Sequence, residues 1–359
     1  MVYIGVSGSS FMTTRKHKVA YRVEQRTINN KPMYYLVKDV KINGEKIKIQ
    51  KYLGRNKPSE EELKQLTEKY ANEIENKAIQ KKAALNSEKI KTKYLSKETV
   101  KTLEIIRYFY KRFKQLLTVN EVTIYEQNFE TSYVHGTTSI EGNTLTKQQT
   151  HDLLVNEILP RDKKLREINE VQNFIKVKQY REQYTDRVTL KFIQTLHSLI
   201  MNNIDYQTAG TFRRLDSLAI AGCDVTLTPA ELIEEELTTI INEYYHAVDH
   251  GYCPFEAAVI FHYNFEIIHP FTDGNGRVGR EIFNYLLSKN GYPRLLFLGS
   301  EREKYIQMLK LGDEGKYNEM VVDFAQLIIS QRLSHLMNNL AKIVTPPKTG
   351  QLRIHDFFF

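Results

Sequence analysis

The chain has 359 residues, of which 41% are hydrophobic and 26% are charged, a balance typical of globular proteins with a buried core. No apolar run is long enough to span a bilayer, and the N-terminal segment lacks the features of a signal peptide, so membrane-spanning and exported proteins are disfavoured. We therefore expect a cytoplasmic location, no membrane partner, and reduced thiols at the two cysteines, Cys223 and Cys253.

The net charge of +8 is distributed unevenly along the chain. Residues 1–58 hold thirteen Lys or Arg residues against three acids, which gives this segment a charge of +10. The remaining residues together carry about −2. All of the excess basicity therefore belongs to a small N-terminal segment.

Residues 1–58 are predicted to form a small basic β domain. Two β-rich runs flank Asn43 and Gly44, the pair of turn residues that most strongly indicates a β-hairpin, because both must accept a positive φ. An earlier strand around residues 19–28 turns back near residues 29–32. The segment is therefore expected to be a three-stranded antiparallel meander.

Charge alternates with apolar residues in the last strand of this meander. Lys46 and Lys48 alternate with Ile47 and Ile49, so one face of the strand is basic and the other is apolar. One interpretation is a sheet that contacts the phosphates of a nucleic acid. The other is a solvated face whose lysines protect an edge strand from pairing with another chain. The sequence leaves both interpretations open.

The rest of the chain is predicted to be mainly α-helical. Residues 59–94 are rich in Glu, Lys, Gln and Ala and are expected to form a solvated helical connector. In residues 95–342 apolar residues recur at intervals of three and four, which indicates a bundle of amphipathic helices. One break, residues 216–229, has β-branched residues around a glycine and is expected to form a β-hairpin flap. Residues 343–359 begin with a Pro- and Gly-containing linker and are predicted to be a flexible tail.

The stretch HPFTDGNGRVGR, from His269 to Arg280, has too little apolar content for a core and too much glycine for a helix interior. We expect a loop that leads into a helix N-terminus, where backbone N–H groups and the helix dipole favour anions. Gly274 and Gly276 allow the backbone to approach oxygen atoms closely, and Asn275 can donate from its amide. Arg277 and Arg280 lie three residues apart and can bind phosphate oxygens.

Two further residues of this stretch have chemistry of their own. Asp273 beside a polyphosphate is suited to Mg²⁺, which prefers one or two carboxylates together with phosphate oxygens and water. His269 can accept a proton from an incoming hydroxyl near neutral pH. Together these residues predict in-line displacement at a nucleotide phosphate, with a hydroxyl group as the nucleophile.

The stretch matches the Fic family motif, His-x-Phe-x-(Asp/Glu)-Gly-Asn-Gly-Arg-x-x-Arg, at every specified position, and the resemblance extends over roughly residues 95–335. It implies a Fic helical bundle and transfer of AMP from ATP to a Ser, Thr or Tyr hydroxyl of a protein, with release of pyrophosphate. His269 would be the general base, Asp273 the Mg²⁺ ligand, and Phe271 the anchor of the loop. The ATP contacts would come from Asp273, Gly274, Asn275, Gly276, Arg277, Val278, Gly279 and Arg280. The phosphotransferase branch typified by the Doc toxin has lysine in place of Gly276, which argues against that branch.

An upstream stretch, TTSIEGN, resembles the inhibitory motif of the same family, (Ser/Thr)-x-x-x-Glu-(Gly/Asn). Thr137, Glu141 and Gly142 occupy its specified positions. If Glu141 pairs with Arg280, that arginine cannot bind the γ-phosphate. The resemblance therefore implies an autoinhibited enzyme, in which Glu141 is also linked to removal of AMP through an oriented water.

Two other regions resemble nucleotide-binding segments of the family. In the flap, Gly222, Cys223, Asp224 and Val225 correspond to a segment that holds the target backbone and the nucleotide by strand addition. Tyr305 falls where relatives place a tyrosine near the adenine. Relatives often carry an asparagine eight residues later, and this chain has Asp313 there.

The last nine residues, QLRIHDFFF, resemble the peptide box that binds the sliding clamp PCNA. A single helical turn would place Ile354, Phe357 and Phe358 on one side as an apolar plug, with Gln351 reaching a polar pocket. The alternative is a tail that packs on its own domain. A PCNA-type clamp is therefore one predicted partner.

The sequence favours an AMP transferase over two alternatives. The first alternative is a clamp- or DNA-associated adaptor whose Fic core senses a nucleotide, although a sensor has no use for His269. The second is transfer of another nucleotide or of a phosphate. A protein carrying the acceptor hydroxyl is the expected substrate, and relatives often form dimers, which makes a homodimer an expectation as well.

Overall fold

The structure is a computed structural model that describes residues 21–42, 44–216 and 227–344. The chain divides into two compact units, residues 1–82 and residues 83–359, and each is described by itself. Residues 217–226 of the predicted flap, which include Gly222, Cys223, Asp224 and Val225, and the predicted clamp-binding peptide lie outside the described residues. Among the described helices, none combines the length and the apolar character that crossing a membrane requires.

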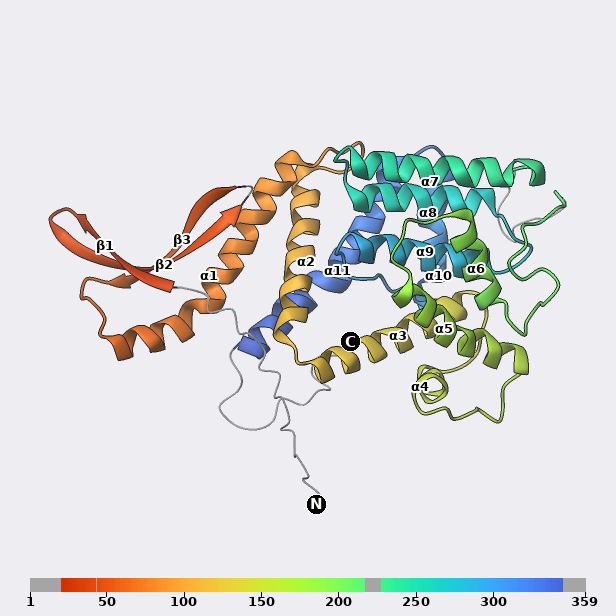
Figure 1. Cartoon of the computed structure of the whole chain (residues 1–359), viewed down its shortest axis with the longest axis horizontal. Coiled ribbons are helices and arrows are strands. Elements are labelled where there is room, and N and C mark those ends of the chain that lie inside the picture. Colours follow the sequence, from red (N-terminus) through yellow and green to blue (C-terminus); the bar gives the residue numbers. More distant parts are fainter. Residues whose placement is uncertain (1–20, 43, 217–226, 345–359) are drawn as a thin grey trace, which may run out of the picture. The chain divides into compact units, whose positions relative to one another are not determined.

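The smaller unit contains a three-stranded antiparallel sheet in the order β1-β2-β3 (Figure 1). Its strands are β1 (Tyr21–Ile28), β2 (Lys31–Ile42) and β3 (Glu45–Gly54). Asn29 and Asn30 join the first two strands with φ angles of 51° and 57°, the left-handed values that a two-residue hairpin turn requires. Gly44, before β3, has a φ of 91°. The predicted meander is therefore present, with a first turn shorter than expected, since Pro32 already pairs with Thr27 inside the ladder.

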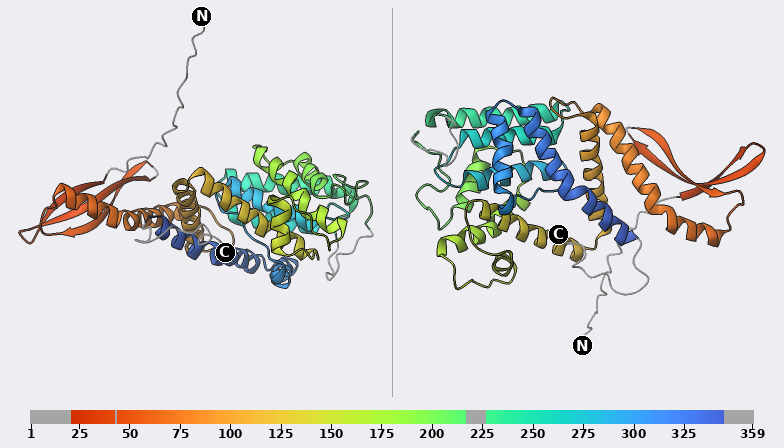
Figure 2. Two further views of the ribbon diagram at one scale, coloured as in Figure 1. Left: turned by 90° about the horizontal axis from the view of Figure 1, so that it is seen from below. Right: turned by 180° about the vertical axis from the view of Figure 1, so that it is seen from behind.

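A single long helix, α1 (Glu60–Lys89), follows the sheet. Its first part runs alongside the sheet (Figure 2). Apolar residues at helical spacing face the sheet there, and Ile74 and Ala78 pack against Leu36 and Ile49. The segment expected to be a solvated connector therefore has a buried face of its own. The sequence pattern hid this face because only a few apolar residues form it among many charged ones.

The larger unit is built from helices, which together with the small sheet confirms the predicted mainly α fold with an N-terminal β meander. Its helices are α2 (Lys97–Leu116), α3 (Val119–Ile140), α4 (Lys147–Val155), α5 (Leu165–Gln183), α6 (Leu190–Ile200), α7 (Ile233–Asp249), α8 (Pro254–Ile268), α9 (Asn275–Lys289), α10 (Arg302–Asp313) and α11 (Tyr317–Val344). Helix α8 packs against α7 and α9, and α11 packs against α2, α8 and α10. The stretch that carries the motif is thus the connection between two central helices.

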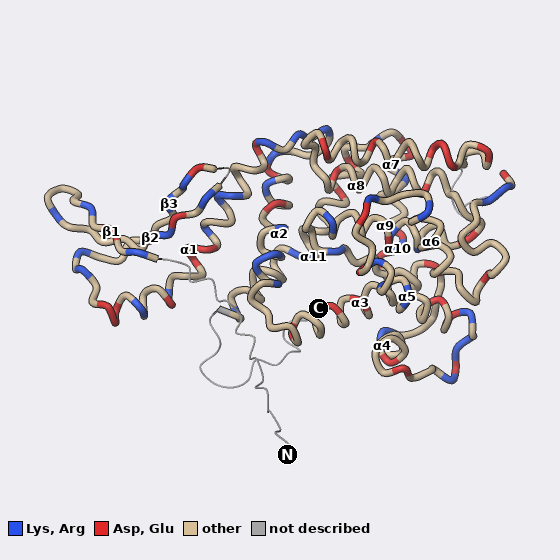
Figure 3. Tube along the Cα trace, viewed as in Figure 1, with Lys and Arg blue, Asp and Glu red and all other residues tan. Residues whose placement is uncertain are grey.

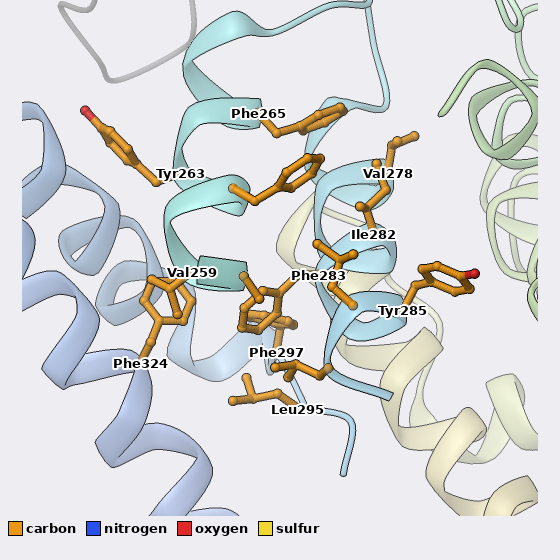
Figure 4. Close-up of a cluster of buried hydrophobic side chains, with 14 of the residues drawn as sticks. Val259, Tyr263, Phe265, Val278, Ile282, Phe283, Tyr285, Leu295, Phe297 and Phe324 are labelled. Atoms are coloured by element: carbon orange, nitrogen blue, oxygen red, sulfur yellow. The ribbon is translucent and has the colours of Figure 1, made fainter. Parts of the chain in front are cut away.

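Aromatic and branched side chains fix α8 and α9 to each other (Figure 4). Phe265 on α8 and Val278, Ile282 and Phe283 on α9 are fully buried. The ring of Phe324, on α11, lies 5.8 Å from that of Phe283. Close packing of this kind leaves little freedom between the two helices, so the loop that joins them is held at both ends.

A buried ion network ties three helices together beneath this cluster. Arg181 on α5 is 8% exposed, and it donates to Glu130 on α3 at 2.8 Å and to Glu281 on α9 at 2.5 Å. Arg294 lies 2.8 Å from the same Glu130. Buried charges are tolerated only when they are paired in this way, so the network fixes how α9 sits against α3 and α5.

Candidate active site

The loop between α8 and α9 begins and ends with left-handed backbone. His269 ends α8 with a φ of 47°, and its N–H donates to Phe265 O at 3.0 Å. Gly274 has a φ of 81° and is the N-cap of α9. A left-handed conformation is costly for a residue with a Cβ, so the strain at His269 has to be compensated by its surroundings.

Asn275 closes the loop from inside. Its Oδ1 accepts from the N–H of Phe271 at 2.9 Å, and its Nδ2 donates to Phe271 O at 2.7 Å. Both residues are buried, and the Phe271 ring is fully so, as expected for an anchor. The side-chain amide of Asn275 thus holds the loop, and its expected contact with an anion stays a prediction.

Two residues that the sequence analysis missed hold the loop from outside. The Nε of Arg213 donates to His269 O at 2.8 Å, and its backbone N–H donates to Pro270 O at 2.9 Å. The Nδ1 of His197 accepts from the N–H of Gly210 at 2.8 Å, so its Nε2 carries the proton and donates to Asp273 O at 3.0 Å. Burial lowers the pKa of His197 to about 4, which keeps this tautomer neutral.

The His197 ring also stacks on Phe271, with ring centroids 3.7 Å apart and planes 4° apart. Neither His197 nor Arg213 lies in a recognisable motif. Both act on the loop from positions more than fifty residues away along the chain, so no local pattern could have identified them.

His269 has the tautomer that a general base needs. Its Nδ1 lies 3.3 Å from Glu266 O, and a carbonyl can only accept, so Nδ1 carries the proton and Nε2 has the lone pair. Burial lowers the pKa of the His269 imidazole, which favours the neutral ring at neutral pH.

His269 lines a cavity of about 170 Å³ together with Gly276, Arg280, Glu141 and Tyr305. The remaining walls come from α8, α10 and the end of α3 and include Glu266 and Asp313. A larger cavity of about 920 Å³ lies elsewhere, between α2 and the end of α9, and contains none of the motif residues. The smaller cavity is the one in which the predicted base, cation and glycine meet.

Arg280 is buried and fully engaged by the upstream stretch. Its Nη2 donates to Glu141 Oε1 at 2.7 Å and to Thr137 O at 3.0 Å, and its Nε donates to Thr137 Oγ1 at 2.8 Å. Burial opposes ionisation of Glu141, but the Arg280 charge outweighs it and holds the pKa of that carboxyl below its usual value. Glu141 is the C-cap of α3, and Gly142 follows with a φ of 94°.

The Glu141 carboxylate lies directly over the start of α9. A Cβ added to Gly276 would come within 2.6 Å of Glu141 Oε1 and within 2.8 Å of Arg280 Nη1. A carboxylate oxygen therefore occupies the space that Gly276 leaves open beside the guanidinium. The site binds an anion in this structure, and that anion is the chain's own glutamate.

Asp273 and Arg277 form a second cluster at the mouth of the loop. Asp273 accepts from Arg166 Nη2 at 2.6 Å and from Arg277 Nη2 at 3.0 Å. Burial raises the pKa of Asp273, but Arg277, the Gly274 N–H and Arg166 outweigh burial and keep that pKa low. Arg166 and Glu170, which also contacts Arg277 at 3.6 Å, were not identified from the sequence.

The buried Nε and Nη1 of Arg277 have no hydrogen-bond partner in the described part of the chain. Nη1 still lies 3.6 Å from the Glu170 carboxylate, so Nε is the nitrogen left to bind an anionic ligand, because buried guanidinium nitrogens are rarely left unsatisfied. In the described ranges, no three His, Cys, Asp or Glu side chains are grouped so as to hold a metal. Asp273 alone, with 44% of its side chain exposed, fits a Mg²⁺ whose other ligands are phosphate oxygens and water.

Two motif residues serve packing. The Val278 side chain is fully buried in the core of Figure 4, so a contact between Val278 and ATP, which stays a prediction, would have to use its backbone. A Cβ on Gly279 would come within 2.3 Å of Glu266 Oε1, so glycine is needed there for α8 and α9 to approach.

Tyr305 lies at the cavity but is only 6% exposed, with its hydroxyl 2.9 Å from Nε2 of His262.

Residues 187–287 match the model of the Fic/DOC family. The proteins named Protein adenylyltransferase Fic from Drosophila ananassae and Drosophila melanogaster are 31% and 30% identical over 194 residues, which are 53% of this chain and 38% of each relative. The chain thus spans well under half the length of these curated relatives.

Two solved structures share the fold. A fragment of Fic-1 from C. elegans superposes with a TM-score of 0.58 and 24% identity, covering 67% of this chain and 72% of that one. A Fic domain containing signaling protein from Bacteroides thetaiotaomicron gives a TM-score of 0.56 and 24% identity, covering 67% of this chain and 96% of that one.

Proposed function

We propose that the chain carries a domain of the Fic/DOC family, whose model matches residues 187–287, and that it transfers AMP from ATP to a hydroxyl side chain of a protein. The observation that supports this most strongly is the cavity that brings His269, Gly276 and Arg280 together at the start of α9. It places the unprotonated imidazole nitrogen of His269 near an anion-binding position beside Gly276 and Arg280. Displacement at a phosphate requires both a base and an anion-binding position.

The reaction follows from these parts. The hydroxyl oxygen of the acceptor attacks the α-phosphorus of ATP, and its proton passes to Nε2 of His269. The bond between the α-phosphorus and the bridging oxygen breaks, and pyrophosphate leaves. Arg277, whose Nε has no hydrogen-bond partner in the described part of the chain, and Arg280, once released from Glu141, hold the phosphates, and the backbone N–H groups at the start of α9 support them.

Mg²⁺ fits the same site through Asp273, where it would neutralise charge on the phosphate oxygens. The Asp273 carboxylate is now held by Arg166 and Arg277, so both guanidinium groups keep it oriented toward the mouth of the loop. Arg166 is largely exposed and can move away without opening the core.

Autoinhibition is the finer part of the proposal. The Glu141 carboxylate fills the anion-binding position beside Arg280, so it competes with the terminal phosphate of ATP for the same guanidinium. The same carboxylate, once displaced slightly, is placed to orient a water for removal of AMP from a modified protein. Both activities would therefore depend on one side chain.

Labelled ATP tests the proposal against its alternatives. The full chain carrying Glu141→Gly is incubated with a cell extract and ATP labelled at the α- or the γ-phosphate, with Glu141→Gly/His269→Ala as the control. Protein labelled only from the α-phosphate, and only when His269 is present, supports AMP transfer. Label only from the γ-phosphate means phosphotransfer, and no label from either means a nucleotide sensor.

Two further proposals rest on the sequence. The C-terminal peptide with Gln351, Ile354, Phe357 and Phe358 would recruit the chain to a PCNA-type clamp, and binding of purified clamp that is lost in Phe357→Ala/Phe358→Ala tests this. A homodimer, which relatives often form, is tested by light scattering of the purified chain.

A further inference from the structure

The sheet of the smaller unit has two faces with different charge arrangements. Directly opposed residues share a face, so Glu24, Tyr35 and Tyr52 lie on one face, and Val23 and Leu36 lie on the other. The second face carries the apolar residues that pack on α1. We call the first one the open face, because no described helix covers it.

On the covered face each cation has its own acid. Lys38 pairs with Glu75, and Lys51 lies 2.7 Å from Glu73, both acids belonging to α1. The charge of this face is therefore balanced residue by residue. Nothing on it is left to attract an external anion.

The open face is different, because six cations share two acids. The cations are Arg22, Arg26, Lys31, Lys41, Lys46 and Lys48, and the acids are Glu24 and Asp39. Figure 3 shows the Lys and Arg positions along the three strands in blue. The net charge of this face is +4. In the described part of the chain neither Lys31 nor Lys41 makes an ion pair, and both are exposed.

The lysine pairs on the open face are weak competitors for a ligand, whereas Arg22 donates from two nitrogens to the less exposed Asp39. Glu24 accepts from Arg22 at 2.7 Å and from Lys48 at 2.9 Å, and Asp39 lies 2.9 Å from Lys46. The Lys46 side chain is 71% exposed and that of Lys48 is 51% exposed. Exposed pairs contribute little, typically about 0–1 kcal/mol, so phosphate groups can replace them.

The middle of the open face carries groups that can contact bases. Arg26 donates to Gln50 Oε1 at 2.6 Å and lies over the Tyr35 ring at 4.9 Å from its centroid. The rings of Tyr35 and Tyr52 are 5.5 Å apart, and Tyr52 is 45% exposed. Guanidinium and amide groups are the side chains that bond base edges in the major groove, and lysines around them suit phosphates.

The dimensions of the sheet favour one class of ligand. Strands about 4.8 Å apart place β1 and β3 about 10 Å from each other, which fits a B-form major groove about 12 Å wide. The major groove of A-form RNA is deep and narrow and would not admit the sheet. An acidic protein would satisfy the charge but would not explain the central guanidinium and amide.

We propose that the open face of the sheet binds double-stranded DNA in the major groove, with lysines on the phosphates and Arg26 and Gln50 toward the base edges. This site is separate from the nucleotide-binding cavity and does not depend on the proposed AMP transfer. It would place the Fic domain on DNA.

The test uses the full chain and a fluorescent DNA duplex of about 30 base pairs, with anisotropy measured at several salt concentrations. Wild-type protein is expected to bind with a dissociation constant on the order of 1–100 μM near physiological salt. With about four phosphate contacts, the slope of log K against log salt should be about −4. Lys31→Glu/Lys41→Glu removes two cations that make no ion pair, so the fold should persist, as checked by thermal melting.

A matched control is Lys176→Glu/Lys191→Glu, which makes the same change in net charge on exposed positions of α5 and α6. The proposal expects Lys31→Glu/Lys41→Glu to weaken binding at least about tenfold and the salt slope to fall by about 2, whereas the control keeps most of the affinity. Equal loss in both variants, or no binding of wild type to the duplex, overturns it. Tighter binding of duplex RNA or of polyglutamate would assign the face to another ligand and would overturn it as well.

Discussion

The Glu141 carboxylate lies 2.7 Å from Nη2 of Arg280 and also occupies the space above Gly276 at the start of α9. The Glu141 side chain thus occupies both the Arg280 guanidinium and the N-terminus of α9, the kind of helix end that binds anions. Because Glu141 sits at the C-cap of α3, its position depends on that helix rather than on the loop it blocks. Release would require only the carboxylate to move, since Thr137 still holds Arg280.

Replacing Glu141 by glycine is therefore expected to raise AMP transfer to a protein acceptor by about tenfold or more, because a competitor worth at least about 1.4 kcal/mol is removed. The measurement is incorporation of α-labelled ATP by purified variants. Glu141→Gln, which keeps the shape but loses the charge, should fall between wild type and Glu141→Gly. Equal transfer by wild type and Glu141→Gly would remove autoinhibition from the proposal.

A substitution at Gly276 tests the proposed anion-binding position itself. In the Glu141→Gly variant no carboxylate occupies the space beside Gly276. A Cβ added at Gly276 would lie 2.8 Å from Arg280 Nη1, in the position proposed for a phosphate oxygen. Glu141→Gly/Gly276→Ala should therefore lose at least about tenfold in transfer relative to Glu141→Gly.

Relative to Glu141→Gly, the stability of this double variant should change little, because the roughly 1 kcal/mol by which alanine favours a helix over glycine offsets the shift that the Cβ forces on Arg280 Nη1, and Gly276 has no positive φ. Thermal melting checks this point. Transfer that persists at the Glu141→Gly rate would place the phosphates elsewhere.

The loop can be tested separately from the chemistry. Asn275→Ala leaves both the N–H and the C=O of buried Phe271 without a partner, so the free energy of unfolding should fall by about 2–4 kcal/mol. Urea denaturation measures this. Asn169 makes a single exposed hydrogen bond to Asn203 O, and Asn169→Ala should cost under about 1 kcal/mol. Similar losses in both variants would contradict the role assigned to Asn275.

The sequence was most informative where the functional residues are adjacent along the chain. From His269 to Arg280 the glycines, the acid and the arginines lie within one turn of loop and one turn of helix, so their spacing alone placed them together. The pairing of Glu141 with Arg280 joins residues far apart in the chain, and it came from the resemblance to a family, not from periodicity.

The parts that could not be predicted are those set by tertiary contacts. Arg213 and His197 donate hydrogen bonds to backbone carbonyls of the loop. Any arginine or histidine can make such bonds, so the residue type alone did not identify these two as loop contacts. The contacts of Asn275 with Phe271 were not predicted because an amide looks the same in the sequence whether it faces a ligand or its own loop. The packing face of α1 was missed because charge dominates its sequence.

A buried carboxyl at the active-site cavity gives a prediction about pH. Glu266 lies within α8, its side chain is 15% exposed, and its Oε1 has no hydrogen-bond partner in the described part of the chain. Burial raises its pKa to about 7, Arg280 on α9 opposes this, and Glu141 beyond α3 reinforces it. His262 on the same helix is buried, and burial lowers its pKa to about 3, so it stays neutral.

The sign of the effect follows from proton uptake. Between about pH 4.5 and 7 the folded protein keeps the Glu266 proton that the unfolded chain has lost, so the free energy of unfolding falls as pH rises through this window. The loss should reach at most about 3 kcal/mol above pH 7. Glu266→Gln cannot ionise, so the difference in stability between it and wild type should grow with pH. Urea denaturation at pH 5 and pH 8 measures this, and a difference that is the same at both values would show that Glu266 is ionised throughout.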